Sequence, residues 1–214
     1  MAGFRPVFPK DGKINLIYAG ALLPRAHQNL RLFLQALLLL EKDPAWKGKV
    51  RVTFIGTGPD PKRPDLHTIR WIAEEMGVGG LVQEVPGRLP YLDVLRNLEA
   101  ADGILVIGSD EAHYSPSKIY QSMLSGKPIL GLMHPESLAT RTVRELGAGV
   151  VATNPGTATL MAEVLAETVK EYVSRILPRF QPVHAGKLEN WSARASAENL
   201  AKALDEVMRL TKPS

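Results

Sequence analysis

Short apolar runs recur along the chain, and segments with apolar residues three and four positions apart separate them, as in Leu30, Phe33 and Leu37. Most of the runs lack a strict alternation of apolar and polar residues, which is typical of strands covered by helices on both faces. Regular exchange of strands and helices predicts right-handed crossovers and a parallel sheet. The six predicted strands are Ile14–Ala19, Val50–Ile55, Leu81–Val85, Gly103–Ile107, Pro128–Leu132 and Gly149–Ala152.

This pattern predicts an α/β fold, a doubly wound, Rossmann-like parallel sheet of six strands with helices on both faces. After the sixth strand the pattern changes. An amphipathic helix is predicted over 157–177, where Pro178 ends it, and a last helix over 192–210. We expect one domain overall, with a Rossmann-like lobe over residues 1–186 and a helical tail over 187–214 that packs across the lobe.

Composition narrows the class of protein. The 214 residues are 45% hydrophobic and 22% charged, as in a globular domain, and the absence of cysteine excludes disulfides and cysteine-ligated metals. A net charge of +4 suits an acidic ligand, but no Lys/Arg block points to nucleic acid. The most apolar stretch, Leu30–Leu40, is too short for a transmembrane segment. We expect a cytoplasmic protein, either free or peripheral to the inner membrane face.

In an open doubly wound sheet, ligands bind beyond the carboxyl ends of the strands, where the strand order reverses. With the common order 3-2-1-4-5-6, this point lies between the first and fourth strands. The loops that follow these two strands cover residues 20–28 and 109–115. The topology therefore predicts a ligand site between these two loops.

The second of these loops leads into the segment Tyr-Ser-Pro-Ser-Lys. We expect Ser115 to be the N-cap of a helix, Pro116 its first residue and Gly126 its terminating glycine. The N-terminus of a helix attracts phosphate, and here Ser117 adds a hydroxyl and Lys118 a cation. The alternative interpretation is a plain helix cap followed by a solvated lysine.

The first loop offers complementary groups. Gly20 allows the backbone to approach a ligand closely, Arg25 has the fork geometry for a diphosphate, and His27 or Gln28 can donate a hydrogen bond. A tight turn with a surface arginine is the alternative. The loop has no G-x-G-x-x-G fingerprint, so we expect no dinucleotide cofactor.

The sequence resembles the carboxyl-terminal lobe of GT-B glycosyltransferases, most closely the retaining family-four enzymes. The resemblance extends from about Lys13 to about Met208, and its most specific part is the Pro-Ser-Lys helix with a Gly-Lys-Pro exit. The stretches that carry it, in order, are INLIYAGALL, VRVTFIGTGPD, LVQEVPGRLPYLDVLRNLEAADGILVIGS, SPSKIYQSMLSGKPIL, VRELGAGVV and NWSARASAENLAKALDEV.

The resemblance implies a C-terminal domain that binds the donor of a hexosyltransferase in carbohydrate biosynthesis. The donor is a nucleotide-diphosphate sugar of the UDP or GDP type, and no cofactor is implied. The two glutamates of the family, which face the sugar and the ribose, correspond here to His113 and Gln121. The remaining implied residues are Val85, Pro86, Gly87 and Arg88 beside the base, and Gly20, Ala21, Arg25, Ser115, Pro116, Ser117 and Lys118 around the diphosphate.

GT-B enzymes have a second lobe, which binds the acceptor. The resemblance thus implies an amino-terminal lobe in the same parent chain or in a partner subunit, a single lobe that is inactive alone, and an exposed apolar side on the last helix. Two alternatives stay open: a non-catalytic module that binds a nucleotide or a partner, and half of another two-lobe sugar-nucleotide enzyme such as an epimerase. The spacing of the histidines predicts no metal site, and no catalytic residue is assigned.

Overall fold

The computed structural model describes residues 4–58, 60, 66–114, 116–153 and 162–210. It divides the chain into two compact units, Met1–Pro182 and Val183–Ser214. The predicted helix cap Ser115 lies outside the described residues, as does the first part of the helix predicted over 157–177.

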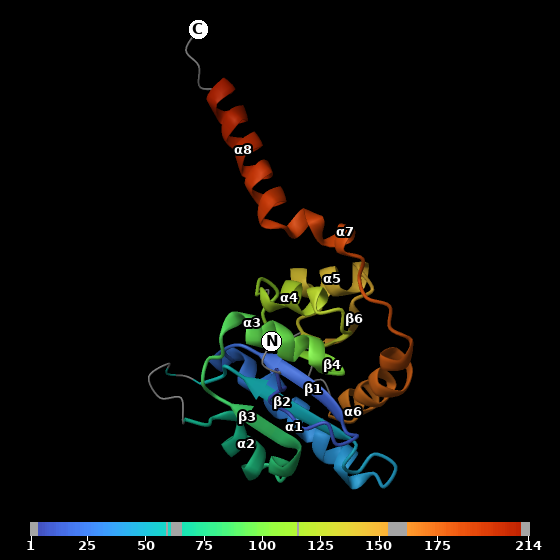
Figure 1. Cartoon of the computed structure of the whole chain (residues 1–214). Helices are drawn as coiled ribbons and strands as arrows, with labels where there is room; N and C mark the ends of the chain where they lie inside the picture. Colours follow the sequence, from blue (N-terminus) through green and yellow to red (C-terminus); the bar gives the residue numbers. More distant parts are fainter. Residues whose placement is uncertain (1–3, 59, 61–65, 115, 154–161, 211–214) are drawn as a thin grey trace. The chain divides into compact units, whose positions relative to one another are not determined.

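The first unit is built on one six-stranded sheet in which all neighbouring strands are parallel (Figure 1). The strand order is β3-β2-β1-β4-β5-β6, so the order reverses between β1 and β4. Both the predicted strand order and the predicted fold class are confirmed. The strands are β1 (Ile14–Ala19), β2 (Val50–Ile55), β3 (Val82–Val85), β4 (Gly103–Ile107), β5 (Ile129–Met133) and β6 (Gly149–Thr153).

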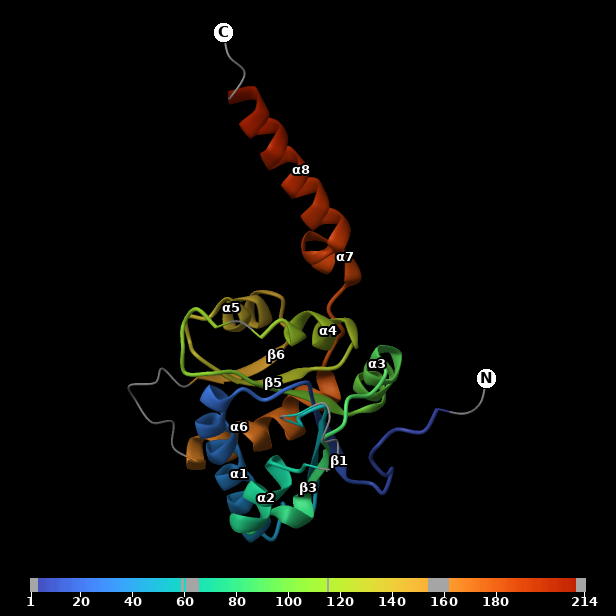
Figure 2. The ribbon, with the colours of Figure 1, turned by 90° about the vertical axis from the view of Figure 1, so that its left-hand side faces the viewer.

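Helices cover both faces of this sheet, and Figure 2 shows α3, α4 and α5 on one face and α1, α2 and α6 on the other. Every residue of β4 and β5 is buried, as expected for strands between two helical layers. The helices and 3-10 turns are η1 (Pro24–Ala26), α1 (His27–Lys42), α2 (Ile69–Glu75), η2 (Gly79–Leu81), α3 (Tyr91–Ala100), α4 (Lys118–Leu124), α5 (Leu138–Glu145), α6 (Ala162–Glu171) and η4 (Leu177–Arg179).

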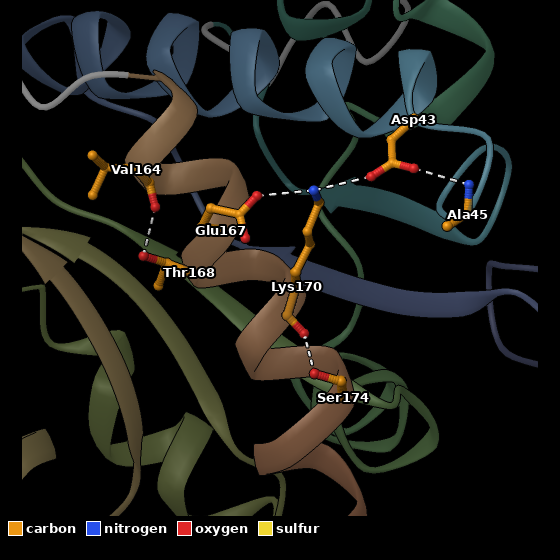
Figure 3. A network of polar contacts seen from close by, with 7 residues as sticks. All are labelled: Asp43, Ala45, Val164, Glu167, Thr168, Lys170 and Ser174. Atoms are coloured by element: carbon orange, nitrogen blue, oxygen red, sulfur yellow. Dashed lines mark hydrogen bonds and ion pairs between the residues drawn. The ribbon is translucent and has the colours of Figure 1, made fainter.

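The helix α6 is fixed to the end of α1 by a charged contact (Figure 3). The Nζ atom of Lys170 lies 3.0 Å from a carboxylate oxygen of Asp43 and 2.9 Å from one of Glu167. Asp43 in turn accepts a hydrogen bond from the backbone N–H of Ala45, at 2.9 Å. The contact joins the helix that follows the last strand to the end of the first crossover helix.

The predicted uniform helix up to residue 177 is interrupted. The α-helix α6 ends at Glu171 and continues as one π turn, η3 (Tyr172–Ile176). The turn coincides with the placement of Tyr172 in the core, where its hydroxyl donates to the carbonyl of Pro128 at 2.6 Å. A side chain on Gly103 would collide with this ring, so the strand needs a glycine there.

The second unit consists of α7 (Ala185–Leu188), the 3-10 turn η5 (Glu189–Trp191) and α8 (Ala193–Leu210). No residue of α8 is buried. Leu200, Leu204 and Val207 lie on one side of this helix and are each more than half exposed. This is the exposed apolar side expected from the resemblance.

Candidate functional site

Two glycines create an opening where β1 and β2 end. The two strands run in register as far as Ala19 and Ile55, and the N–H of Gly20 donates to the carbonyl of Ile55 at 2.8 Å. Gly20 and Gly56 then adopt φ values of 108° and 67°, which residues with a Cβ rarely take. The segments that follow β1 and β2 can therefore turn away from the sheet side by side.

A pocket of about 330 Å³ lies at this end of the sheet, within the usual range of about 300–1,000 Å³ for small-molecule sites. It collects residues from the exits of β1 and β2, the loop after β3, and the helices α3 and α4. Four of the predicted site residues line it: Gly20, Ala21, Arg88 and Gln121. The other lining residues are Ala19, Ile55, Gly56, Leu89, Tyr91 and Val94.

The contribution of α3 to the pocket was not predicted from the sequence. Tyr91 and Val94 line the pocket from the first turns of this helix, and the Tyr91 ring is exposed. The proline before Tyr91 marks the helix start in the sequence, but only the sheet order places this start beside the exit of β1. Tyr91 offers an aromatic surface to a planar ligand group.

Lys118 directs its amine to the Gly20–Ala21 loop rather than into water. The Nζ atom donates to the hydroxyl of Tyr18 and lies 3.4 Å from the carbonyl oxygen of Ala21. It is also 3.8 Å from the centre of the Tyr18 ring. Burial lowers the pKa of Lys118 from 10.5 to about 7.

The backbone at Gly20 lies close to this amine. A Cβ atom on Gly20 would lie 3.6 Å from the Nζ atom of Lys118. The loop that lines the pocket and the amine of Lys118 are therefore in direct contact. A ligand anion near Gly20 would lie next to a cationic group.

The start of α4 differs from the prediction. The helix begins at Lys118, after a turn in which the N–H of Ile119 donates to the carbonyl of Pro116 at 3.1 Å. The prediction that Pro116 is the first helical residue is therefore wrong, because a tighter turn precedes the α-helical bonds. Ser117 occupies the N-cap position and makes no side-chain capping bond. Gly126, with φ 71°, ends the helix as predicted.

Arg25 and His113 lie elsewhere. Arg25 forms an ion pair with Glu111, and both line a second pocket of about 420 Å³ together with Pro24, Gln28 and Asp110. His113 is largely exposed, with its Nε2 atom 3.9 Å from a carboxylate oxygen of Glu111. The structure thus gives Arg25 and Lys118 different partners and does not bring Arg25 or His113 into the lining of the first pocket.

The run predicted beside the base contributes mainly its backbone. The N–H of Gly56 donates to the carbonyl of Val85 at 2.9 Å, and the N–H of Gly58 donates to the carbonyl of Pro86 at 2.9 Å. These bonds join the exits of β2 and β3. Of the run, only Arg88 lines the pocket; Val85, Pro86 and Gly87 do not.

A buried carboxylate supports these two exits. Glu84 accepts a hydrogen bond from the hydroxyl of Thr57 at 2.7 Å and one from the N–H of Arg70 at 2.9 Å. The Nδ1 atom of His67 lies 3.5 Å from the same carboxylate. Glu84 therefore links β3 to the chain after β2 and to the first turn of α2.

Within the described ranges, no three or more His, Cys, Asp or Glu side chains are grouped so that they could hold a metal ion. None of the described helices combines the length and apolar character that crossing a bilayer requires.

No protein-family model and no curated protein matches the sequence. Solved structures do match. One is a UDP-forming α,α-trehalose-phosphate synthase from Burkholderia vietnamiensis, with 13% identity and a TM-score of 0.67 over 95% of this chain and 46% of that chain. Another is Alr3699/HepE from Anabaena in complex with UDP, with 17% identity and a TM-score of 0.64 over 91% and 49%.

A third match is WaaG, a glycosyltransferase involved in lipopolysaccharide biosynthesis, with 17% identity and a TM-score of 0.56 over 78% of this chain and 39% of that chain. At these identities the likeness concerns the fold. It confirms the expected fold, that of a GT-B lobe. The chain spans less than half the length of each of these proteins.

Proposed function

We propose that this chain is the donor-binding lobe of a glycosyltransferase and that its pocket takes the nucleotide diphosphate of a sugar donor. The observation that carries the proposal is the meeting of Gly20, Ala21, Arg88 and Gln121 around one pocket, with the amine of Lys118 against its Gly20–Ala21 wall. The pocket lies at the carboxyl ends of the strands, where doubly wound sheets bind their ligands.

Each group has a task in this arrangement. The planar base lies between Tyr91 and the loop that carries Arg88, and the ribose hydroxyls face the amide of Gln121. The diphosphate lies over the Gly20–Ala21 backbone, which has no Cβ at Gly20 to keep it away. Lys118 supplies the positive charge.

Transfer requires the bond between the sugar and the diphosphate to break, which leaves additional negative charge on the diphosphate. A preorganised cation at this position stabilises that charge in the transition state. Lys118 is suited to this role because it already lies in a partly dry environment, where charge interactions are stronger than in water. The acceptor and the remaining catalytic groups belong to a second lobe, from the parent chain or a partner subunit.

UDP is the first ligand to test, because one of the matched solved structures is a UDP-forming synthase and another is a complex with UDP. Isothermal titration calorimetry with UDP, GDP and ADP will measure affinity and base preference. We expect one of the three to bind with a Kd below about 1 mM. Absence of heat and of thermal stabilisation with all three at millimolar concentration would contradict the proposal.

A second function, a nucleotide-binding module without turnover, is favoured by one observation. Among the described residues, no carboxylate lines the pocket, and Gln121 is the position to which the resemblance assigns a family glutamate. The module would bind UDP or GDP as well. A transfer assay with the complete parent protein distinguishes the two, because only the enzyme hydrolyses or transfers a sugar from the bound donor.

A further inference from the structure

We propose that Tyr18 is the positioning residue for Lys118, with its hydroxyl holding the lysine amine against the Gly20–Ala21 loop. The inference rests on the proposed function only in taking the ligand to be a diphosphate. Tyr18 belongs to β1 and is buried. Its place in an apolar strand would identify it, from the sequence, only as a core residue.

The hydroxyl of Tyr18 joins two segments. It donates to the carbonyl of Ala21 at 3.0 Å and accepts from the amine of Lys118. Ala21 follows β1, whereas Lys118 begins α4, a hundred positions along the chain from Tyr18. One buried oxygen atom therefore fixes the loop and the helix start relative to each other.

The ring of Tyr18 is itself held firmly. It is 1% exposed and packs against Phe54 of β2, with ring centres 5.5 Å apart. The amine of Lys118 lies near its face, a position that attracts a cation. A lysine side chain has four rotatable bonds, and this double contact removes much of the freedom that ligand binding would otherwise have to restrict.

The ionisable groups around the amine agree with this role. Burial lowers the pKa of Lys118 and raises that of Tyr18, which Tyr114 from the loop after β4 raises further. Tyr18 is therefore a neutral hydroxyl over the working pH range, able to donate to Ala21 and to accept from Lys118. The amine changes its charge near neutral pH and gains most from a bound anion.

The variant Tyr18→Phe tests the inference, because it keeps the ring and removes only the hydroxyl. Competitive labelling of the amines of the ligand-free full chain from about pH 5 to about pH 11 gives the pKa of each lysine. In the wild type we expect Lys118 to titrate near 7. In Tyr18→Phe the released amine reaches water, and we expect its pKa to rise by about one unit or more.

UDP affinity at about pH 6 gives the second readout. At this pH Lys118 is charged in both proteins, so a difference in affinity between them reports only the placement of the amine. We expect Tyr18→Phe to bind UDP about five- to tenfold more weakly. The matched control is Tyr172→Phe, which removes a second buried hydroxyl whose partner, the carbonyl of Pro128, is not part of the pocket. This control should lose stability without changing UDP affinity or the titration of Lys118.

Unchanged titration of Lys118 together with unchanged UDP affinity in Tyr18→Phe would overturn the inference. If that variant does not fold, the labelling of the wild type alone tests the inference. A Lys118 that titrates at its ordinary pKa of 10.5 would not be held by Tyr18. If the wild type binds none of UDP, GDP and ADP, the proposed function fails, whereas the labelling of the ligand-free chain still tests the role of Tyr18.

Discussion

Lys118 keeps its amine in a half-buried position and pairs it with a tyrosine hydroxyl instead of a carboxylate. Desolvation of a cation without a counter-charge is unfavourable, and the lowered pKa measures that cost. In the proposed function, a bound diphosphate supplies the missing counter-charge. In that proposal Lys118 serves an anionic ligand rather than the stability of the free protein.

Replacement of this residue should weaken binding and remove a pH dependence. Because a diphosphate favours the charged amine, binding takes up a proton above about pH 7, and the affinity of the wild type falls as the pH rises. From about pH 7 to about pH 9 we expect about a tenfold loss or more. Lys118→Met should bind about ten- to a hundredfold more weakly at about pH 7 and show no such slope. Calorimetry across the pH range measures both.

A suitable control is Lys127→Met, because Lys127 follows the other end of α4 and lines a different pocket together with Asp102 and Phe180. Its UDP affinity and pH profile should match those of the wild type. A pH slope that persists in Lys118→Met would assign the proton uptake to another group.

Gly20 is the second residue to replace, and its replacement should change both stability and UDP binding. Gly20→Ala should lower the free energy of unfolding by about 1–2 kcal/mol, because φ 108° is unfavourable for alanine. It should also weaken UDP binding, since the new methyl group lies between the loop and the amine of Lys118. Gly12→Ala introduces similar strain at φ 85° with nothing within 4 Å, so it should lower Tm alone. Denaturant unfolding and calorimetry separate the two effects.

At the scale of elements, Glu84 connects β3 with α2 and the chain after β2. Glu84→Ala removes the acceptor for Thr57 and for the N–H of Arg70, and we expect a loss of about 2–4 kcal/mol in the free energy of unfolding. The matched control is Glu74→Ala, whose exposed pair with Arg70 should contribute less than about 1 kcal/mol. If both variants lowered the free energy of unfolding in urea equally, burial would not explain the contribution of Glu84 to stability.

The contact between α6 and the end of α1 predicts a second pH effect, on stability. Hydrogen bonding to Lys170 lowers the pKa of Asp43 below 3.8, and Glu167 and Asp43 raise that of Lys170 above 10.5. The pair therefore stabilises the fold between these values, and its contribution is lost as the pH falls through the lowered pKa of Asp43. Lys170→Met should lower Tm slightly at neutral pH and not at about pH 2, as read by circular dichroism. An equal decrease at both pH values would contradict an electrostatic origin.

The sequence was sufficient for the regular elements and insufficient for their irregular ends. Apolar runs located all six strands, because strands covered on both faces must be apolar. The π turn at Tyr172–Ile176 and the late start of α4 depend on how Tyr172 and Lys118 fit into the folded core. Patterns of neighbouring residues contain no information about such long-range contacts.

For the whole molecule, the strand order placed the predicted site at the end of the sheet where the pocket lies. Gly20, Ala21 and Gln121 meet there as the crossover rule requires. The pairing of Arg25 with Glu111 could not be predicted, because the loop conformation decides which of two nearby groups an arginine reaches. Tyr18 was missed for a related reason: a buried tyrosine in a strand is usually only a core residue.

All lining residues of the pocket precede Pro182, where the first compact unit ends. A chain that stops at Pro182 should therefore keep cooperative thermal unfolding and bind UDP with an affinity within about twofold of the full chain. Circular dichroism and calorimetry on both chains check this expectation. Loss of the folded state in the shorter chain would show that the second unit is needed for folding.

The strand order also has a consequence for synthesis on the ribosome. Of the two partners of β1, β2 is the next strand to be translated, whereas β4 is translated only after β2 and β3. During that interval the middle of the future sheet is an open edge able to pair with foreign strands. A nascent chain released before β4 would expose this edge.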